Sequence, residues 1–338
     1  MPRLKIDGFV LALVVVVAAA IIWPEPGRTG GLLHWELITT YGVCIVFFLY
    51  GLTLAPERMR QGLTRWKAHL MVVLTTFVIF PVVVLAAESL GTFGLPEAAS
   101  IGFFYVAALP STVSSSVAMV SLARGNVPVA IFNATLSSLL AVFVTPALMA
   151  WYLKSSGAPV PLLPTVMKVV LLVLLPIVLG QIARHWLAGW ASRRGRMIKL
   201  ADRGVILAIV YGAFCDSVSE GLFSRTDPAT LIEIAALAIL LFFIVFALTA
   251  LGSKLLGMTR DDTIAVQFCG SKKSLATGVP LAPIIFAGRS DIGLIILPIM
   301  MFHFFQLLIV SVIAARYARQ VTDEEPAKAA RVSGSAAE

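Results

Sequence analysis

The feature that most constrains this chain is a succession of ten apolar stretches, separated by short polar or proline-containing segments. A helix of about 20 apolar residues crosses the hydrocarbon core of a bilayer. Only 13% of the residues are charged, whereas soluble domains average about 25%. We therefore predict an all-α polytopic membrane protein and exclude a cytosolic enzyme, a disordered chain and a secreted disulfide scaffold. The predicted spans are Gly8–Trp23, Leu37–Leu54, His69–Ala87, Glu97–Leu122, Val127–Tyr152, Leu162–Leu187, Leu200–Val218, Thr230–Leu256, Thr263–Phe286 and Ile292–Ala315.

The distribution of lysine and arginine supports this count of spans. With the N-terminus inside, 19 of the 26 basic residues fall in inner segments and 4 in outer segments. A missed or extra span would exchange inside and outside for every later loop and remove this asymmetry. We therefore expect a protein of the cell (inner) membrane with both termini cytoplasmic. The net charge of +8 then reflects basic inner loops, and no nucleic acid partner is expected. We expect two of these loops, Pro56–Lys67 and Ala188–Lys199, to be interfacial amphipathic pieces.

The ten spans divide into two halves of five. Because five is odd, the second half must insert with the opposite orientation, as in transporters built from inverted repeats. This predicts a first repeat over residues 1–156, an inverted second repeat over 157–320 and a disordered cytoplasmic tail over 321–338. The fourth segment of each half is interrupted, and paired interruptions are typical of a binding site near the middle of the membrane.

The fourth segment contains Pro110, closely followed by five hydroxyl side chains. Proline removes a backbone donor from a helix, and nearby hydroxyls can bond to the freed backbone groups. Free backbone groups at membrane depth are tolerated only where they face protein or a watery cavity. A proline kink with hydroxyls used for helix packing is the alternative, although it accounts for five hydroxyls less well. The candidate binding residues here are Ser111, Thr112, Ser114, Ser115 and Ser116.

The ninth segment carries two adjacent lysines near its middle. A lysine at the bilayer centre costs about 2.5–3.5 kcal/mol, so two of them require a functional reason. Alternatively, the lysines mark the inner end of a helix and reach the lipid headgroups. The remaining stretch would then be too short to return across the membrane, so we favour buried lysines. The candidate binding residues of this segment are Gln267, Ser271, Lys272, Lys273 and Ser274.

Polar residues on neighbouring spans are further candidates for the same pocket, although each alone is more often an interhelical hydrogen bond. No carboxylate lies centrally in either interrupted segment. A buried lysine without a counter-ion either loses its proton or binds an anion, and helix N-termini at the breaks add positive potential. The sequence therefore predicts a site for an anion, or a proton-linked cycle. The additional candidates are Thr76, Asn133, Thr135 and His303.

Four motifs resemble the bile acid:sodium symporter family, in particular its divergent bacterial branch related to the seventh human member of that solute-carrier family. They are Phe48–Leu54, Ala108–Ala118, Leu122–Asn126 and Cys269–Ala276, and the resemblance covers residues 5–320. It implies a panel of helices 1, 2, 6 and 7 and a core in which segments 4 and 9 cross. Substrate would bind between panel and core, and alternating access would move one against the other.

The chain departs from this family at the positions that bind sodium. In sodium-coupled members the ninth segment supplies a Glu and a Gln, helix 3 supplies a Gln, and helix 5 supplies hydroxyls. The resemblance implies that these ligands are lost here, so no metal site is assigned. Our hypothesis is that the ammonium of Lys272 or Lys273 takes the place of the sodium ion. The positions concerned are Phe268, Lys272, Thr76, Ala130 and Ala134.

These observations predict a secondary transporter of a small organic anion, with its site where segments 4 and 9 cross. Transport would be sodium-independent or proton-coupled, and the expected partners are the lipid bilayer, the anion and protons. The alternative is a non-transporting membrane regulator of ion homeostasis. An enzyme is not expected, because motifs such as His-Glu-x-x-His and Gly-x-Ser-x-Gly are absent from the sequence. No cofactor is expected either.

Overall fold

The computed structural model describes residues 8–31, 33–53, 64–91, 94–155, 167–168, 170–219, 221 and 227–334. Every regular element in these ranges is a helix. Five helical runs are long and apolar enough to cross a membrane, and shorter apolar helices accompany them, as expected for an integral membrane protein. The five are Trp66–Ser89, Val127–Ser155, Val170–Arg193, Pro228–Leu255 and Ile292–Gln320.

The elements follow the predicted apolar stretches closely. In the first half they are α1 (Gly8–Ile22), η1 (Glu25–Gly27), α2 (Trp35–Thr53), α4 (Trp66–Leu74), η3 (Thr75–Ile79), α5 (Phe80–Ser89), α6 (Glu97–Ala108), α7 (Ser114–Leu122) and α8 (Val127–Ser155). In the second half they are η4 (Val170–Leu174), α10 (Leu175–Arg193), α11 (Gly195–Ser219), α12 (Pro228–Leu255), α13 (Arg260–Gly270), α14 (Leu275–Ile285) and α15 (Ile292–Gly334). Both η3 and η4 are single π-helical turns.

The inner segment Ala188–Lys199, predicted to be an interfacial amphipathic piece between two spans, is helical at nearly every position, and residues 56–63 of the other such segment lie outside the described residues. α10 continues through this segment and α11 begins two residues after it ends, so that only Arg194 separates the two helices. The helices continue because Ala191 and Ile198 are buried against Leu52 of α2 in a small apolar cluster. The last helix also extends beyond Ala315, its predicted end, since the residues that follow are good helix formers.

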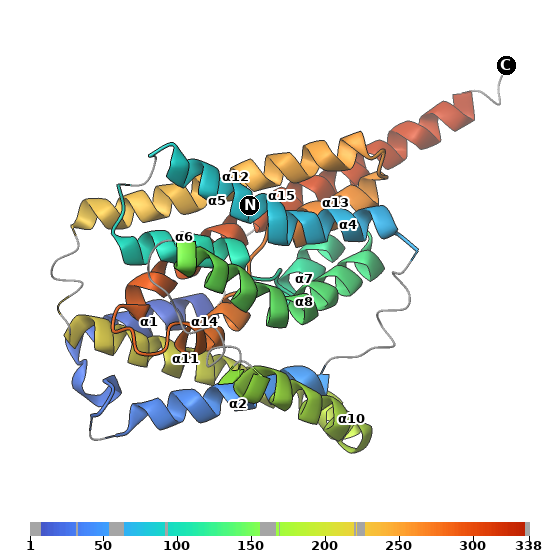
Figure 1. Cartoon of the computed structure of the whole chain (residues 1–338). Coiled ribbons are helices and arrows are strands. Elements are labelled where there is room, and N and C mark those ends of the chain that lie inside the picture. Colours follow the sequence, from blue (N-terminus) through green and yellow to red (C-terminus); the bar gives the residue numbers. More distant parts are fainter. Residues whose placement is uncertain are drawn as a thin grey trace.

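Four helices, α1, α2, α10 and α11, form one layer, at the bottom of Figure 1. α2 packs on α10 and α11, and α1 packs on α11. Glycines let the α2 and α10 backbones touch, because a Cβ at Gly51 would collide with the Ile177 carbonyl and one at Gly180 with the Phe48 carbonyl. The Gln181 side-chain amide also donates to the Gly51 carbonyl at 2.7 Å. We call these four helices the four-helix layer.

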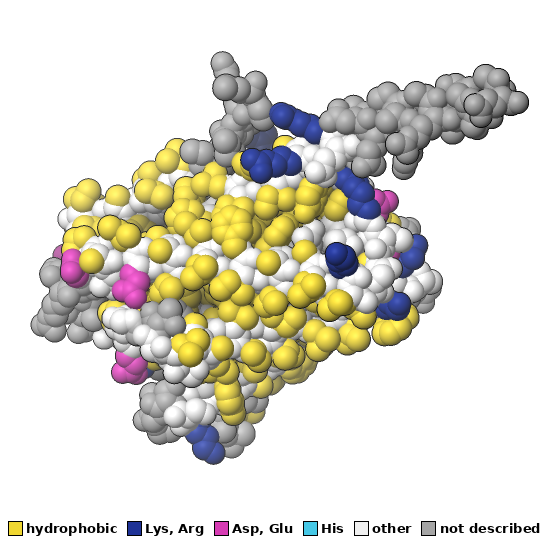
Figure 2. All heavy atoms as spheres, turned by 90° about the horizontal axis from the view of Figure 1, so that it is seen from above, with side chains coloured by type: hydrophobic (Ala, Val, Ile, Leu, Met, Phe, Trp, Pro, Cys, Tyr) yellow, Lys and Arg dark blue, Asp and Glu magenta, His cyan; other side chains and the backbone are white. Residues whose placement is uncertain are grey.

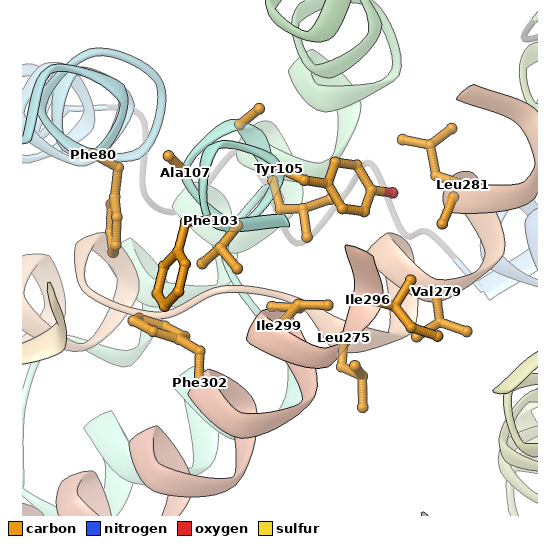
Figure 3. Packing of buried hydrophobic residues seen from close by; sticks show 14 of the residues in the cluster. Phe80, Phe103, Tyr105, Ala107, Leu275, Val279, Leu281, Ile296, Ile299 and Phe302 are labelled. Carbon is orange, nitrogen blue, oxygen red and sulfur yellow. The ribbon is translucent and has the colours of Figure 1, made fainter. Parts of the chain in front are cut away.

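The remaining helices, α4 to α8 and α12 to α15, form a larger unit that we call the main body (Figure 1). At its centre, every residue of α6 from Ile101 to Ala108 is buried. Figure 3 shows Phe103 of α6 turned toward Phe302 of α15, with Phe80 of α5 on the same side. The rings of Phe80 and Phe302 lie 5.9 Å apart between centroids. A helix that is apolar on all sides, as α6 is, belongs in such a core.

The surface carries a broad apolar band with charge at its two ends (Figure 2). In this view most of the visible Asp and Glu side chains lie toward the left-hand end, and most Lys and Arg toward the right-hand end. On α10, at the bottom of Figure 1, the side chains of Leu175, Val178 and Ile182 are exposed as well. Large aliphatic side chains of this kind are suited to contact with lipid.

Polar contacts tie the helix ends together at both ends of the molecule. At the end where α13 begins, which we call the basic end, buried Asp262 accepts a hydrogen bond from Asn126 at 2.7 Å and lies 3.7 Å from Arg65. At the end where α15 begins, which we call the acidic end, Arg289 donates to Asp291 at 2.8 and 2.6 Å. The hydrogen bonds to this carboxylate raise the pKa of Arg289.

Candidate functional site

Two interrupted helices meet inside the main body. The backbone leaves the helical conformation at Leu109, one residue after α6 ends, and α7 begins only at Ser114. The second interruption separates α13 from α14, and its last residue, Ser274, donates its backbone N–H to the carbonyl of Pro110 at 2.9 Å. The two breaks therefore touch through their main chains, and we call this region the crossing.

Hydroxyls of α8 satisfy backbone groups that the first break frees. The N–H of Ser111 donates to Ser137 Oγ at 2.9 Å, and Thr145 Oγ1 donates to the carbonyl of Ala108 at 2.7 Å. Buried backbone groups without partners are costly in an apolar interior. The polar positions of α8 are therefore part of the support for the crossing.

Lys273 supplies the cation at the centre of the crossing. Its side chain is fully buried, and its Nζ donates to three carbonyl oxygens, those of Thr76, Ala107 and Leu109, each at 2.7 Å. The same Nζ lies 4.1 Å from the centroid of the Phe80 ring, which adds a cation–π contact. An ammonium has three N–H donors, so all the donors of Lys273 Nζ are used within the protein.

These three carbonyls are free because the local helices cannot use them. In η3 the Phe80 N–H donates to the Thr75 carbonyl, five residues back. With the same spacing of five residues, Pro81 would be the donor to the Thr76 carbonyl, but proline has no backbone N–H. The other two carbonyls, from Ala107 and Leu109, flank the point where α6 stops. Lys273 therefore binds where two helices are interrupted.

Lys272 points to a different set of groups. It is also fully buried, but its Nζ has one partner, Ser115 Oγ at 2.8 Å. Ser115 in turn donates to Thr112 Oγ1 at 2.9 Å, and Thr112 shares a 2.8 Å hydrogen bond with Ser116. Ser116 donates to the carbonyl of Phe268 at 3.1 Å. The hydroxyls after Pro110 thus form a chain that links α7 to α13 and ends at Lys272.

Gln306 of α15 holds the backbone of the second break. Its Oε1 accepts the N–H of Lys273 at 2.8 Å, and its Nε2 donates to the carbonyl of the same residue at 2.7 Å. His303 Nδ1 lies 2.7 Å from Gln306 Nε2 and 3.3 Å from the Lys273 carbonyl. The two hydrogen bonds from Gln306 to the backbone of Lys273 fix the direction in which the Lys273 side chain leaves the main chain.

The structure brings together many of the predicted site residues, but several lie elsewhere or play a local role. Asn133 is bonded to His69 at 3.1 Å, and Gln267 accepts from Tyr317 at 3.2 Å. Ser271 donates to its own helix, at the Gln267 carbonyl, and Ser274 caps α14. Ser114 is exposed. Thr135 is buried on α8.

The positions predicted to have lost sodium ligands are occupied by apolar packing or by a lysine. The Phe268 ring stacks on Phe246 and Tyr317. Ala130 and Ala134 contribute only carbonyl oxygens, to Cys269 Sγ at 3.8 Å and to Ser138 Oγ at 2.9 Å. The side-chain oxygen of Thr76 is buried without a partner, although its carbonyl binds Lys273.

Sequence reasoning missed some residues that shape the site. Phe80 and Tyr105 lie in apolar stretches and carry no polar pattern, yet Phe80 faces Lys273 and the Tyr105 hydroxyl donates to the Gly278 carbonyl of α14 at 2.6 Å. One available signal was Pro81, since a proline inside a helix leaves a carbonyl free one turn earlier.

Within the described part of the chain, no carboxylate forms an ion pair with Lys272 or Lys273. Two fully buried amines without a carboxylate give the crossing an uncompensated positive charge whenever they are protonated. Such an arrangement is suited to holding an anion.

Comparison with known proteins identifies the family. The family model described as the SBF-like CPA transporter family matches residues 7–319. The chain belongs to this family. It is 39% identical over 329 residues to an uncharacterized protein of Pseudomonas aeruginosa, covering 97% of this chain and 98% of the relative.

Several named relatives of this SBF-like chain come from vertebrates. It is 34% identical to sodium/bile acid cotransporter 7 of Xenopus tropicalis, covering 92% of this chain and 91% of that protein. It is 33% identical to the protein of the same name from Rattus norvegicus, with 92% of each chain covered. These matches confirm the resemblance predicted from the four motifs. The chain is a membrane transporter of the bile acid:sodium symporter type.

Proposed function

We propose that this protein is a secondary transporter that moves a small organic anion across the cell membrane by alternating access. Its ten spans would form two inverted repeats, 1–156 and 157–320, followed by the tail 321–338, with both termini in the cytoplasm. The proposal is supported by the two breaks, which occupy the fourth position of each half and touch at the crossing. The four-helix layer and the main body would be the two parts that move.

The observation that carries this proposal is the pair of buried amines at the crossing. Lys272 and Lys273 are both 0% exposed, and neither is paired with a carboxylate in the described part of the chain. Buried ionisable groups inside membrane spans usually mark a substrate or ion pathway. An organic anion is the substrate class that would balance their charge.

The environment of Lys273 supports transport without sodium. Three carbonyl oxygens around one centre, each at 2.7 Å, are ligands that a metal cation could also use. Here the ammonium of the chain itself occupies their centre. By the resemblance, the ring of Phe268 would stand where sodium-coupled members of the family carry a carboxylate. Driving force would then come from protons or from the anion gradient.

The exposed face of α7 supports an open path from the basic end. Its exposed positions include Ser114, Ala118 and Ser121, whereas the exposed positions of α10 include Leu175 and Ile182. Small and hydroxylic side chains at membrane depth are expected beside water or protein rather than lipid. Water would therefore reach the crossing along α7.

The acidic end supports a closed path on the opposite side. The Ser217 hydroxyl of α11 donates to the Ser290 carbonyl at 3.2 Å and accepts the Gly293 N–H of α15 at 3.0 Å. A Cβ at Gly293 would lie 2.5 Å from Ser217 Oγ, so the four-helix layer and the main body are in close contact here. Together with the exposed α7 face, this contact supports the proposal of an inward-open state.

Uptake into proteoliposomes tests the proposed function. We expect the purified protein to accumulate cholate, or another member of a panel of organic carboxylates and sulfates, equally well when sodium is replaced by choline. Dependence of uptake on sodium would contradict the role proposed for Lys273. Absence of uptake for the whole panel, together with a cellular phenotype that survives Lys272→Met, would favour the membrane regulator instead.

A further inference from the structure

Lys272 and Lys273 differ in how many of their donors the protein uses. Each ammonium has three N–H groups. Lys273 Nζ donates to three carbonyls and its fourth side is covered by Phe80. Lys272 Nζ donates to Ser115 alone, and no further acceptor or ion-pair partner for it is found among the described residues. Two donors of Lys272 therefore remain for a ligand, and none of Lys273.

The surroundings of Lys272 supply further donors. Its partner Ser115 lies in the first turn of α7, and no side chain caps this turn, since the residue at the cap position is Val113. The first N–H groups of a helix have no partner inside the helix and attract negative charge. The hydroxyls of Thr112 and Ser116 complete the same corner. The buried ammonium and the start of α7 thus converge on one place.

This corner is close to the exposed part of the crossing. Ser115 is half-buried, and its neighbour Ser114 is exposed. On the other broken segment, Ala276 in the first turn of α14 is exposed as well. A ligand that reached Ser115 would meet Lys272, whereas Lys273 lies behind, covered by α5 and α6.

We infer that Lys272 is the anion-binding residue of the transport site and that it takes one singly charged head group, a carboxylate or a sulfonate. Lys273 is a fixed cation that binds no ligand. The inference rests on the proposed function and narrows its substrate class to organic monoanions. The second charged group of a dianion would find no free N–H donor at the crossing, because all three donors of Lys273 Nζ are used by carbonyls.

The experiment measures thermal unfolding of the purified full-length protein in detergent. Acetate replaces sulfate at constant ionic strength, and malonate is the matched dianion. We expect acetate to raise the unfolding temperature saturably in the wild type, and malonate to have at least tenfold weaker apparent affinity. Lys272→Met should remove the acetate effect. Ser253→Ala, which deletes a buried hydroxyl without a partner on α12, should retain it.

Each other outcome overturns the inference. These are no saturable acetate effect in the wild type, an effect that survives Lys272→Met, or equal affinity for malonate. Lys272→Arg provides a second variant, which keeps the charge and should keep at least part of the acetate effect. Transport itself is judged separately. Uptake that continues in Lys272→Met would support the proposed transport function and contradict the role of Lys272 in binding the anion. Acetate binding by Lys272 without any uptake would support that role and contradict the transport function.

Discussion

Lys272 and Lys273 are adjacent, chemically identical and fully buried, yet their contacts give them different energetic roles. A hydrogen bond to a charged group contributes about 1.5–3 kcal/mol, and a desolvated cation–π contact about 2 kcal/mol. Lys273 makes three such hydrogen bonds and one such contact, whereas Lys272 makes one hydrogen bond. The protein therefore compensates the burial of Lys273 far better than that of Lys272.

The first prediction compares two neighbouring substitutions. Lys273→Met should lower the free energy of unfolding by several kcal/mol, because it leaves three buried carbonyls without a partner, each costing about 1–3 kcal/mol. Lys272→Met should have a much smaller effect, since it removes one hydroxyl contact and an uncompensated charge. Thermal unfolding in detergent measures both. Equal losses in the two variants would contradict the assignment of Lys273 as a fixed cation.

At the scale of the elements, each break depends on a neighbouring helix for its backbone partners. α8 supplies hydroxyls to the first break, and α15 supplies Gln306 to the second. A break in a membrane helix without such partners would leave polar groups in an apolar interior, at several kcal/mol each. The breaks are thus defined as much by the intact helices beside them as by their own residues.

The second prediction tests this support with two adjacent serines of α8. Ser137→Ala removes the acceptor of the Ser111 N–H and should lower stability by about 1–3 kcal/mol. Ser138→Ala should cost less, because the Ser138 hydroxyl donates to a carbonyl of its own helix and approaches the Tyr50 hydroxyl of α2, so that it supports no backbone group of the break. Chemical unfolding in detergent gives both values. A larger loss for Ser138→Ala would contradict the proposed support.

The third prediction concerns the contact of α2 with α10. Gly180→Ala places a methyl group against the carbonyl of Phe48, so the two helices must separate. We expect the free energy of unfolding to fall by about 1–3 kcal/mol, the usual range when a well-packed contact is overfilled. Gly204→Ala on α11 is the control, because nothing lies within 4 Å of its added Cβ. The free energy of unfolding of that variant should stay unchanged or rise by up to about 1 kcal/mol, because alanine has a higher helix propensity than glycine. Unfolding temperatures compare the two, and an unchanged Gly180→Ala would disprove the close contact.

The sequence predicts the helices more reliably than it predicts the contacts between them. Apolar length and proline positions fix where a membrane helix can start and stop, and the sequence predicts one break in the segment that contains Pro110 and the other in the segment that contains the two lysines. The π turn η3 was not predicted, because Thr75–Ile79 is as apolar as an ordinary helix. Which of the two lysines meets the carbonyls could not be predicted either. Backbone direction inside the break decides it, through contacts with α15 that are distant in sequence.

At the scale of the whole molecule, the four-helix layer and the main body differ in how they are held together. The layer relies on close backbone approach at Gly51 and Gly180. The main body is linked by polar groups at the crossing and by the buried Asp262 at the basic end. The two parts touch at the acidic end through Ser217 and Gly293. This division favours rigid-body motion of one part against the other.

The fourth prediction tests the exposed face of α7 by cysteine labelling. In a background without the native cysteines, Ser121→Cys should react with a water-soluble maleimide severalfold faster than Leu175→Cys, although both positions are exposed. Lipid would cover the second position and water the first. Adding Gly293→Leu should slow labelling of Ser121→Cys, because the larger side chain opens the contact with Ser217 at the acidic end. Equal reaction rates at positions 121 and 175 would exclude a water-lined α7.

The position of the Lys273 ammonium, among three carbonyls of other helices, has a consequence for where such a protein can work. A dissolved ion must be captured from the medium, and its occupancy falls when the medium is dilute. A cation that is part of the polypeptide has no dissociation rate, and its local concentration does not depend on salinity. This pocket therefore stays filled in fresh water and in brine alike, as long as the chain remains folded and the amine keeps its proton.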